Sequence, residues 1–254
     1  MELAKTVLLF ILVAISMIII IPLGLIIFIL SAVGLRKLMN RVVYAIAQGW
    51  ALVLIRTTGC RPRVTGREHI PKKGGVCLVS NHGSIFDILL LLAYVGRPFG
   101  FIAKKELAWI PFLNIWILLL GGLFIDRGSL RKAAKTISRG IQHIKAGGGM
   151  IIFPEGHRSK GRGLLPFHSG SFKLAAQPEA PVIPVAISGS YDVFERHYRV
   201  KRVSVRIAFE KPVLASEIPL ERRRQRLADL VYGIIQQTLR EQAAENGEPV
   251  PENQ

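Results

Sequence analysis

A histidine and an aspartate lie close together in the heptad 81–87, Asn-His-Gly-Ser-Ile-Phe-Asp. Four residues separate His82 from Asp87. An aspartate that holds one imidazole nitrogen orients the other nitrogen as a base, which is the orienting half of a Ser-His-Asp triad. Such a base can make a hydroxyl nucleophilic without a covalent enzyme intermediate. The heptad therefore indicates proton abstraction from a hydroxyl group.

The same heptad also fits the start of a helix. Ser84 and Asp87 form a Ser-x-x-Asp pattern ahead of an apolar run, in which Ser84 caps the helix and Asp87 stabilises its first turn. The two interpretations can coexist, because an aspartate in the first turn lies close to the residues just before that turn. Local spacing leaves both open.

The hydroxyl that such a base would activate is expected to belong to a substrate. The sequence contains no Gly-x-Ser-x-Gly nucleophile motif. Its two cysteines, Cys60 and Cys77, match no metal-binding spacing, and we expect both to be reduced structural residues of a protein that faces the cytosol.

A second segment, 153–162, combines glycine with basic side chains directly after an expected strand. The backbone at Gly156 could approach a ligand closely, because glycine has no side chain. Arg158 could bind a phosphate, since a guanidinium group makes bidentate contacts with such anions. A solvated basic loop is an equally good interpretation of the composition.

Two more segments have ordinary structural explanations when each is taken alone. The segment 122–127 is a short apolar run that ends in Asp126 and Arg127, which suit a local ion pair or a helix start. The segment 182–187 is typical of a buried strand.

Short apolar runs alternate with helical patterns from residue 76 onward, which predicts an α/β fold with a mixed sheet flanked by helices. Ser129 and Ser216 are expected to cap two of the helices. The chain divides into membrane-anchoring helices at 1–60, a main domain at 61–243 and a disordered polar tail at 244–254. The expected strands are 76–80, 99–103, 122–125, 150–153, 182–187 and 203–209, and the expected helices are 85–94, 107–120, 131–145 and 216–242.

The N-terminal residues predict a membrane anchor. The run 7–30 is almost purely aliphatic, and a helix of this length could cross a bilayer core of about 30 Å. Pro22 permits either a kinked span or a re-entrant hairpin. Basic residues follow at 36–41 and place the downstream domain in the cytoplasm. A second apolar stretch, 40–58, suits an interfacial or packing helix.

The formal net charge is +17 and the mean hydropathy is +0.36. This balance suggests a polyanionic partner, which could be nucleic acid, an anionic membrane surface or a phosphorylated substrate. No helix-turn-helix, RNP or zinc pattern supports nucleic acid. The basic segments 196–206 and 222–226 suit anionic lipid headgroups instead.

Taken together and in this order, these segments resemble the glycerolipid acyltransferase superfamily, and most of all the 1-acylglycerol-3-phosphate (lysophosphatidic acid) acyltransferases. The heptad matches the Asn-His-x-x-x-x-Asp signature of that family. Residues 124–127 match its Phe-Ile-Asp-Arg block, and Pro184 lies in the fourth block. Residues 153–159 match Phe-Pro-Glu-Gly-Thr-Arg-Ser except that His157 replaces the threonine. The resemblance covers roughly 65–210.

The resemblance implies a membrane-bound enzyme that acylates the free hydroxyl of 1-acylglycerol-3-phosphate and gives phosphatidic acid. His82, oriented by Asp87, would be the base, and the donor would be an acyl-CoA or an acyl-carrier protein. No metal or redox cofactor is implied. Two alternatives stay open: another lysolipid or aminolipid acceptor, and a non-enzymatic membrane protein that binds anionic lipid or nucleic acid. The substrate-binding residues would be Glu155 and Gly156, with Arg158 on the phosphate and Arg127 or Lys105 assisting.

Overall fold

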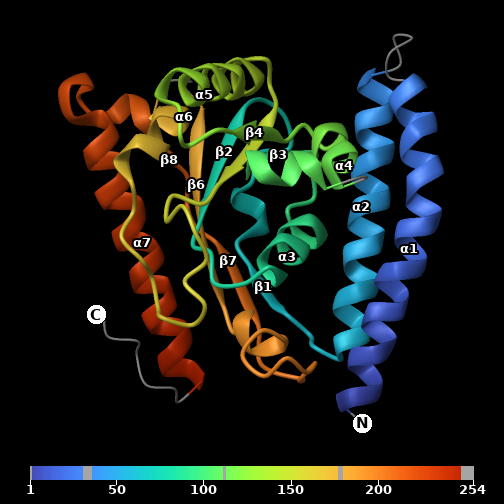
Figure 1. Ribbon diagram of the computed structural model, residues 1–254. Coiled ribbons are helices and arrows are strands. Elements are labelled where there is room, and N and C mark those ends of the chain that lie inside the picture. The colour runs from blue at the N-terminus through green and yellow to red at the C-terminus, as the bar shows by residue number, and fades with distance from the viewer. Residues whose placement is uncertain (1, 31–35, 111–112, 177–179, 247–254) are drawn as a thin grey trace.

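The computed structural model describes residues 2–30, 36–110, 113–176 and 180–246. Two long helices, α1 (Glu2–Leu30) and α2 (Arg36–Thr58), run antiparallel along one side of the molecule (Figure 1). Helix α1 continues through Pro22. Helix α2 packs against α3 (Phe86–Tyr94), as expected of a packing helix. Within the described residues, one stretch, Leu38–Thr58, has the length and composition to cross a membrane.

The other elements surround one eight-stranded sheet with the strand order β1-β7-β6-β2-β5-β3-β4, in which β8 pairs with β6. Strands β2, β5, β3 and β4 are parallel neighbours, and β6 is parallel to β2 but antiparallel to β7 and β8. The sheet is therefore mixed, as predicted. The strands are β1 (Arg63–Thr65), β2 (Val76–Ser80), β3 (Gly100–Lys104), β4 (Leu123–Ile125), β5 (Gly149–Ile152), β6 (Pro181–Ser188), β7 (Arg206–Phe209) and β8 (Val213–Leu214).

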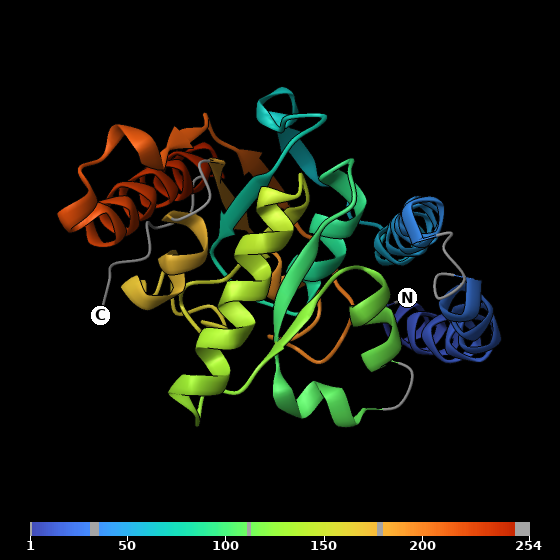
Figure 2. The same ribbon diagram turned by 90° about the horizontal axis from the view of Figure 1, so that it is seen from above.

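Helices cover both faces of this sheet. Leu78 of β2 lies in a core shared with α2 and α3, whereas its neighbours Cys77 and Val79 face a second core shared with α5 (Leu130–Lys145), α6 (Lys173–Ala176) and α7 (Arg223–Asn246). Seen from above, α7 lies on the opposite side of the molecule from α1 and α2 (Figure 2). Because both faces are covered, β2 and β5 are buried along their whole length.

The predicted strand 76–80 and the predicted cap at Ser129 are confirmed, the latter by a hydrogen bond from the Lys132 backbone N–H to the Ser129 hydroxyl (3.4 Å). Most other boundaries shift by a residue or two. The strand expected over 203–209 begins only at Arg206.

Two helix predictions are wrong. In place of one helix over 107–120, the chain forms a 3₁₀ helix, η3 (Lys105–Trp109), and a short helix, α4 (Leu113–Leu119); residues 111–112 lie outside the described ones. Pro111 has no N–H to donate to a helical ladder, which argues against one continuous helix. The side-chain amide of Asn114 donates to the Ala108 carbonyl (2.9 Å), and its backbone N–H donates to the Ile110 carbonyl (3.2 Å).

Ser216 does not cap the last long helix. It lies in a 3₁₀ turn, η6 (Ala215–Glu217), and a second such turn, η7 (Leu220–Arg222), precedes α7. Pro219 is the reason, because a proline disfavours the helical conformation of the residue before it, and Ile218 is extended (φ −105°, ψ 130°). Helix α7 continues to Asn246 and so includes the first residues of the tail that was expected from 244. Residues 247–254 lie outside the described part of the chain. The proposed domain limits stay a prediction.

The topology places the chemistry at one edge of the sheet. Because β2, β3, β4 and β5 are parallel, their carboxyl ends meet at that edge. The heptad follows β2, Lys105 follows β3, Asp126 and Arg127 follow β4, and the segment 153–162 follows β5. Ligands bind to open α/β sheets at such an edge.

Candidate active site

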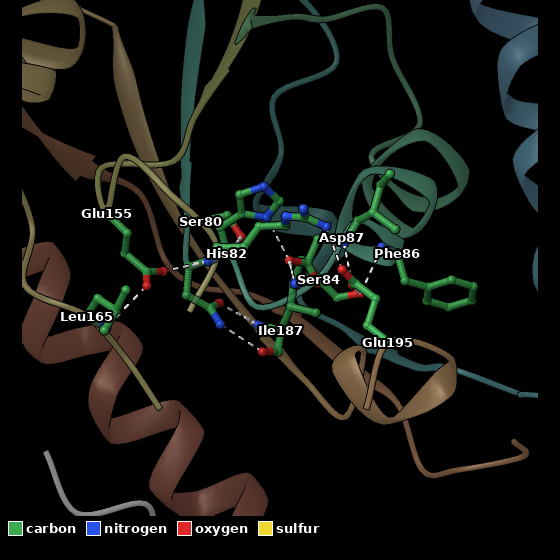
Figure 3. Close-up of polar contacts among 12 residues, drawn as sticks. Ser80, His82, Ser84, Phe86, Asp87, Glu155, Leu165, Ile187 and Glu195 are labelled. Atoms are coloured by element: carbon green, nitrogen blue, oxygen red, sulfur yellow. Dashed lines mark hydrogen bonds and ion pairs between the residues drawn. The ribbon is translucent and has the colours of Figure 1, made fainter. Parts of the chain in front are cut away.

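His82 and Asp87 form a hydrogen-bonded pair between the end of β2 and the first turn of α3 (Figure 3). The distance from His82 Nδ1 to Asp87 Oδ2 is 2.9 Å. The Asp87 side chain is fully buried, and that of His82 is 17% exposed. A carboxylate can only accept a hydrogen bond. Nδ1 therefore carries a proton and donates a hydrogen bond to Asp87. Nε2 is then the ring nitrogen that can take a proton from a substrate.

The helix-start interpretation of the heptad also holds. Asp87 Oδ2 accepts a second hydrogen bond from the Ser84 backbone N–H (2.9 Å), and the Ser84 hydroxyl accepts one from the Phe86 N–H (3.0 Å). One carboxylate therefore both orients the histidine and stabilises the first turn of α3. The His82 ring also stacks on Phe153, with ring centroids 4.1 Å apart, which further restricts its rotation.

Asn81 ties the heptad to strand β6. Its side-chain amide donates to the Ile187 carbonyl (2.9 Å) and accepts from the Ile187 N–H (2.8 Å). The amide thus replaces the backbone partner that a further strand residue would supply at this position. The sequence motif includes Asn81 but gives no hint of this role, because Ile187 lies 106 residues away.

Glu155 holds the backbone of the heptad from the loop that follows β5. One oxygen, Oε1, accepts from the His82 N–H (2.5 Å), and Oε2 accepts from the Leu165 N–H (3.2 Å) (Figure 3). The residue is only 1% exposed. Burial raises the pKa of Glu155 to about 7, and the two backbone donors oppose this shift only partly. The buried position favours a supporting role over direct contact with an acceptor.

The loop after β5 crosses the heptad by backbone pairing. The Ser159 N–H donates to the His82 carbonyl (2.8 Å), and the Lys160 N–H donates to the Gly83 carbonyl (3.2 Å). Gly156 has a left-handed backbone (φ 76°), which glycine adopts without strain. Its N–H closes a turn onto the Phe153 carbonyl (3.1 Å), so this amide is already in use.

The three basic residues that were predicted to bind the acceptor phosphate lie at this edge, each with a different partner. Lys105 Nζ pairs with Asp126 Oδ1 (2.9 Å), and Arg127 donates to the Gly156 carbonyl. Arg158 Nη1 pairs with Glu195 Oε1 (2.5 Å). Glu195 was missed at the level of sequence, because no local pattern connects a glutamate to an arginine 37 residues earlier in the chain.

Comparison with known proteins decides the family. The sequence profile described as Acyltransferase matches residues 61–188, which include the heptad, the Asp126-Arg127 pair and the loop after β5. The chain belongs to the acyltransferase family. The profile covers six strands of the sheet in full, β1 to β6, and these include the four, β2 to β5, whose carboxyl ends form the site edge.

Three curated relatives of this acyltransferase have the name 1-acyl-sn-glycerol-3-phosphate acyltransferase. The relative from Borreliella burgdorferi is 35% identical over 54% of this chain and 54% of its own length. The relative from Escherichia coli is 40% identical over 45% and 47%, and that from Saccharomyces cerevisiae is 33% identical over 60% and 53%. The acyltransferase thus spans about half the length of the curated relatives that it matches.

One solved structure resembles the acyltransferase over nearly its whole length. The crystal structure of the 1-acyl-sn-glycerophosphate (LPA) acyltransferase PlsC from Thermotoga maritima has a TM-score of 0.77 and 26% sequence identity. The match covers 93% of this chain and 95% of that one. The shared architecture therefore includes the helices outside the profile match as well as the sheet.

Proposed function

We propose that this acyltransferase transfers a fatty acyl group from an acyl thioester to the free hydroxyl of 1-acylglycerol-3-phosphate, which gives phosphatidic acid. The observation that carries the proposal is the 2.9 Å hydrogen bond between His82 Nδ1 and the buried Asp87 carboxylate, which leaves Nε2 to accept a proton. The names of the relatives supply the substrate class, and the cations Lys105, Arg127 and Arg158 at the same edge suit a phosphate.

The transfer proceeds without an acyl-enzyme. Nε2 of His82 takes the proton of the acceptor hydroxyl while the oxygen attacks the thioester carbonyl. The buried Asp87 carboxylate stabilises the imidazolium that forms. When the tetrahedral intermediate collapses, the carbon–sulfur bond breaks and the thiolate receives the proton from Nε2, so His82 returns to its starting state. The thioester supplies the activated acyl group, so the proposed reaction requires no metal or redox cofactor.

The proposed setting is the cytoplasmic surface of a membrane. Both substrates have acyl chains, and α1 has many exposed apolar side chains, among them Val7, Phe10 and Ile26. The net charge of +17 favours an anionic lipid surface and also a polyanionic donor, either coenzyme A or an acidic carrier protein.

A panel of acylation assays tests the proposal. Detergent-solubilised full-length protein is mixed with 1-acylglycerol-3-phosphate, with other lysolipids and with an aminolipid, each with acyl-CoA and with acyl-carrier protein as donor. We expect phosphatidic acid as the main product, and we expect His82→Ala to lower its rate by about three orders of magnitude. Faster acylation of another acceptor would assign a different substrate. Equal rates for His82→Ala and the wild type would exclude His82 as the base.

A further inference from the structure

Glu195 joins the two segments to which the proposed chemistry belongs. It follows a short 3₁₀ turn, η5 (Tyr191–Val193), and is far from both segments in the sequence. Its Oε2 accepts from the Ser84 hydroxyl and from the Ile85 N–H (2.8 Å), which lie at the start of α3. Its Oε1 accepts from Arg158 Nη1 (2.5 Å). Figure 3 shows Glu195 beside Ser84 at the start of the helix that contains Asp87. One carboxylate therefore connects this helix with the arginine of the loop after β5.

The surroundings make this connection stiff. The Glu195 side chain is 16% exposed and that of Arg158 is 37% exposed, so water competes only partly for the ion pair. Charge-assisted hydrogen bonds in such a setting are about twice as strong as neutral ones. Within the described part of the chain, Glu195 is the acidic partner of Arg158. Its other oxygen is anchored to α3, so the position of Arg158 depends on that of the helix.

We propose that Glu195 is a positioning residue for acceptor binding: it holds the Arg158 guanidinium where that group contacts the phosphate of the acceptor. The inference rests on the proposed function. A guanidinium has five N–H donors, so the pairing of Nη1 with Glu195 leaves donors for a phosphate. An arginine that is already fixed loses less side-chain entropy when the phosphate binds.

The start of α3 has hydrogen bonds that do not involve Glu195. An effect of Glu195 on Arg158 can therefore be distinguished from an effect on the stability of the helix. Without Glu195, the Ser84 hydroxyl still accepts from the Phe86 N–H, and Asp87 still accepts from the Ser84 N–H. Asp87 also keeps its bond to His82. Loss of the Glu195 carboxylate should therefore release Arg158 while the base remains in place.

The test is the split between KM and kcat in Glu195→Gln. We expect the KM for 1-acylglycerol-3-phosphate to rise about tenfold, which corresponds to the loss of part of a charged hydrogen bond, with kcat within about twofold of the wild type. An acceptor without phosphate, such as a monoacylglycerol, should show no such rise. In an Arg158→Ala background the same substitution should add little, because the group that it positions is gone.

Asp192→Asn is the matched control. The ion pair of Asp192 is with Arg196 (2.5 Å) in the same segment rather than with Arg158, so its loss should leave the KM unchanged. If Glu195→Gln unfolds, Glu195→Asp keeps the charge and should give an intermediate KM. A lower KM in Glu195→Gln would show that Glu195 competes with the phosphate, and an unchanged KM would show a purely structural residue; either result overturns the proposal. Failure of the proposed function is distinct, because wild-type protein would then not acylate 1-acylglycerol-3-phosphate.

Discussion

A single oxygen of Asp87 accepts from both His82 Nδ1 and the Ser84 N–H. Asp87→Asn replaces the carboxylate by a neutral amide, whose oxygen can still accept a hydrogen bond but carries no negative charge. We expect kcat to fall by about a thousandfold, because the imidazolium that forms loses the charge that stabilises it. The measurement is steady-state acylation at saturating acceptor.

Ser84→Ala separates catalysis from helix stability. This substitution removes the hydroxyl that accepts from the Phe86 N–H and should lower the free energy of unfolding by about 1 kcal/mol. It leaves the His82–Asp87 pair intact, so kcat should stay near the wild-type value. An equal fall of kcat in Ser84→Ala and Asp87→Asn would contradict a catalytic role for Asp87.

Glu155 makes stability depend on pH. Burial raises its pKa from 4.5 to about 7 in the folded protein, so the folded state binds more protons than the unfolded state between these values. The free energy of unfolding should therefore be highest below pH 4.5 with respect to this group, and it should fall by roughly 3 kcal/mol as the pH rises through 7. Glu155→Gln removes the titrating group. As the pH rises, the free energy of unfolding of the variant should therefore increase relative to that of the wild type.

Urea unfolding at pH 5 and pH 8 measures this shift. At pH 5 the variant should be the less stable protein, because the amide NH₂ faces one of the backbone donors that Glu155 now binds. Glu217→Gln, at an exposed position, serves as the control, and its stability difference from the wild type should be the same at both pH values. An equal difference at both pH values for Glu155→Gln as well would show that Glu155 does not titrate in this range.

How far the site could be predicted depends on sequence distance. His82, Asp87 and Ser84 fall within one heptad, so their contacts follow from one strand end and one helix start. The partners Glu195 and Ile187 come from segments more than a hundred residues away from the heptad, and only the folded sheet brings them there. The role of Glu155 was also hidden, because its burial follows from the packing of a loop.

At the level of elements, the site depends on the contact between β2 and β6 beyond the end of their ladder. The last backbone pair joins Ser80 and Val185, and the Asn81 amide continues the pairing at Ile187. Asn81→Ala leaves the N–H and carbonyl of Ile187 without this partner. We expect a loss of about 2 kcal/mol in the free energy of unfolding and a lower kcat, because the heptad is no longer held against β6.

Thermal unfolding and kcat, measured on the same preparation, check this expectation. Gln237→Ala is a suitable control, because it removes a hydrogen bond to Glu241 (2.8 Å) that is exposed on α7. The control should change the Tm little. An Asn81→Ala protein with wild-type Tm and kcat would show that the hydrogen bonds between Asn81 and Ile187 do not hold the heptad in place.

Elements with continuous burial were easier to predict than those at the margins. Strand β2 is buried at every residue, so its apolar run has clear ends. Strands β1 and β8 are short and partly exposed, and they have no such run. The predictions of helices over 107–120 and 216–242 were wrong because of Pro111 and Pro219. A proline lacks an N–H and disfavours the helical conformation of the residue before it, and this effect outweighs the surrounding apolar pattern.

At the scale of the whole molecule, apolar side chains are exposed near the site edge. Trp109 in η3 is 86% exposed, and Leu130 at the start of α5 is 89% exposed. Both follow strands whose carboxyl ends form that edge, and the Lys105–Asp126 pair connects the two segments. Helix α4, next along the chain from η3, contacts α1 (Figure 2). A bilayer that contacts α1 would therefore also reach the site edge.

Trp109→Ser combined with Leu130→Ser tests whether this edge faces the bilayer. Each apolar side chain contributes about 1–2 kcal/mol when it is buried, so binding to vesicles that contain anionic lipid should weaken about tenfold or more. Vesicle flotation measures the bound fraction, and added salt should weaken the binding further, because the basic residues Arg131 and Lys132 follow Leu130 directly. Leu220→Ser is the matched control, since Leu220 is 79% exposed but precedes α7, across the molecule from α1. If Leu220→Ser releases the protein from vesicles and the double variant does not, the bilayer contacts the α7 side and the basic segment 222–226 instead.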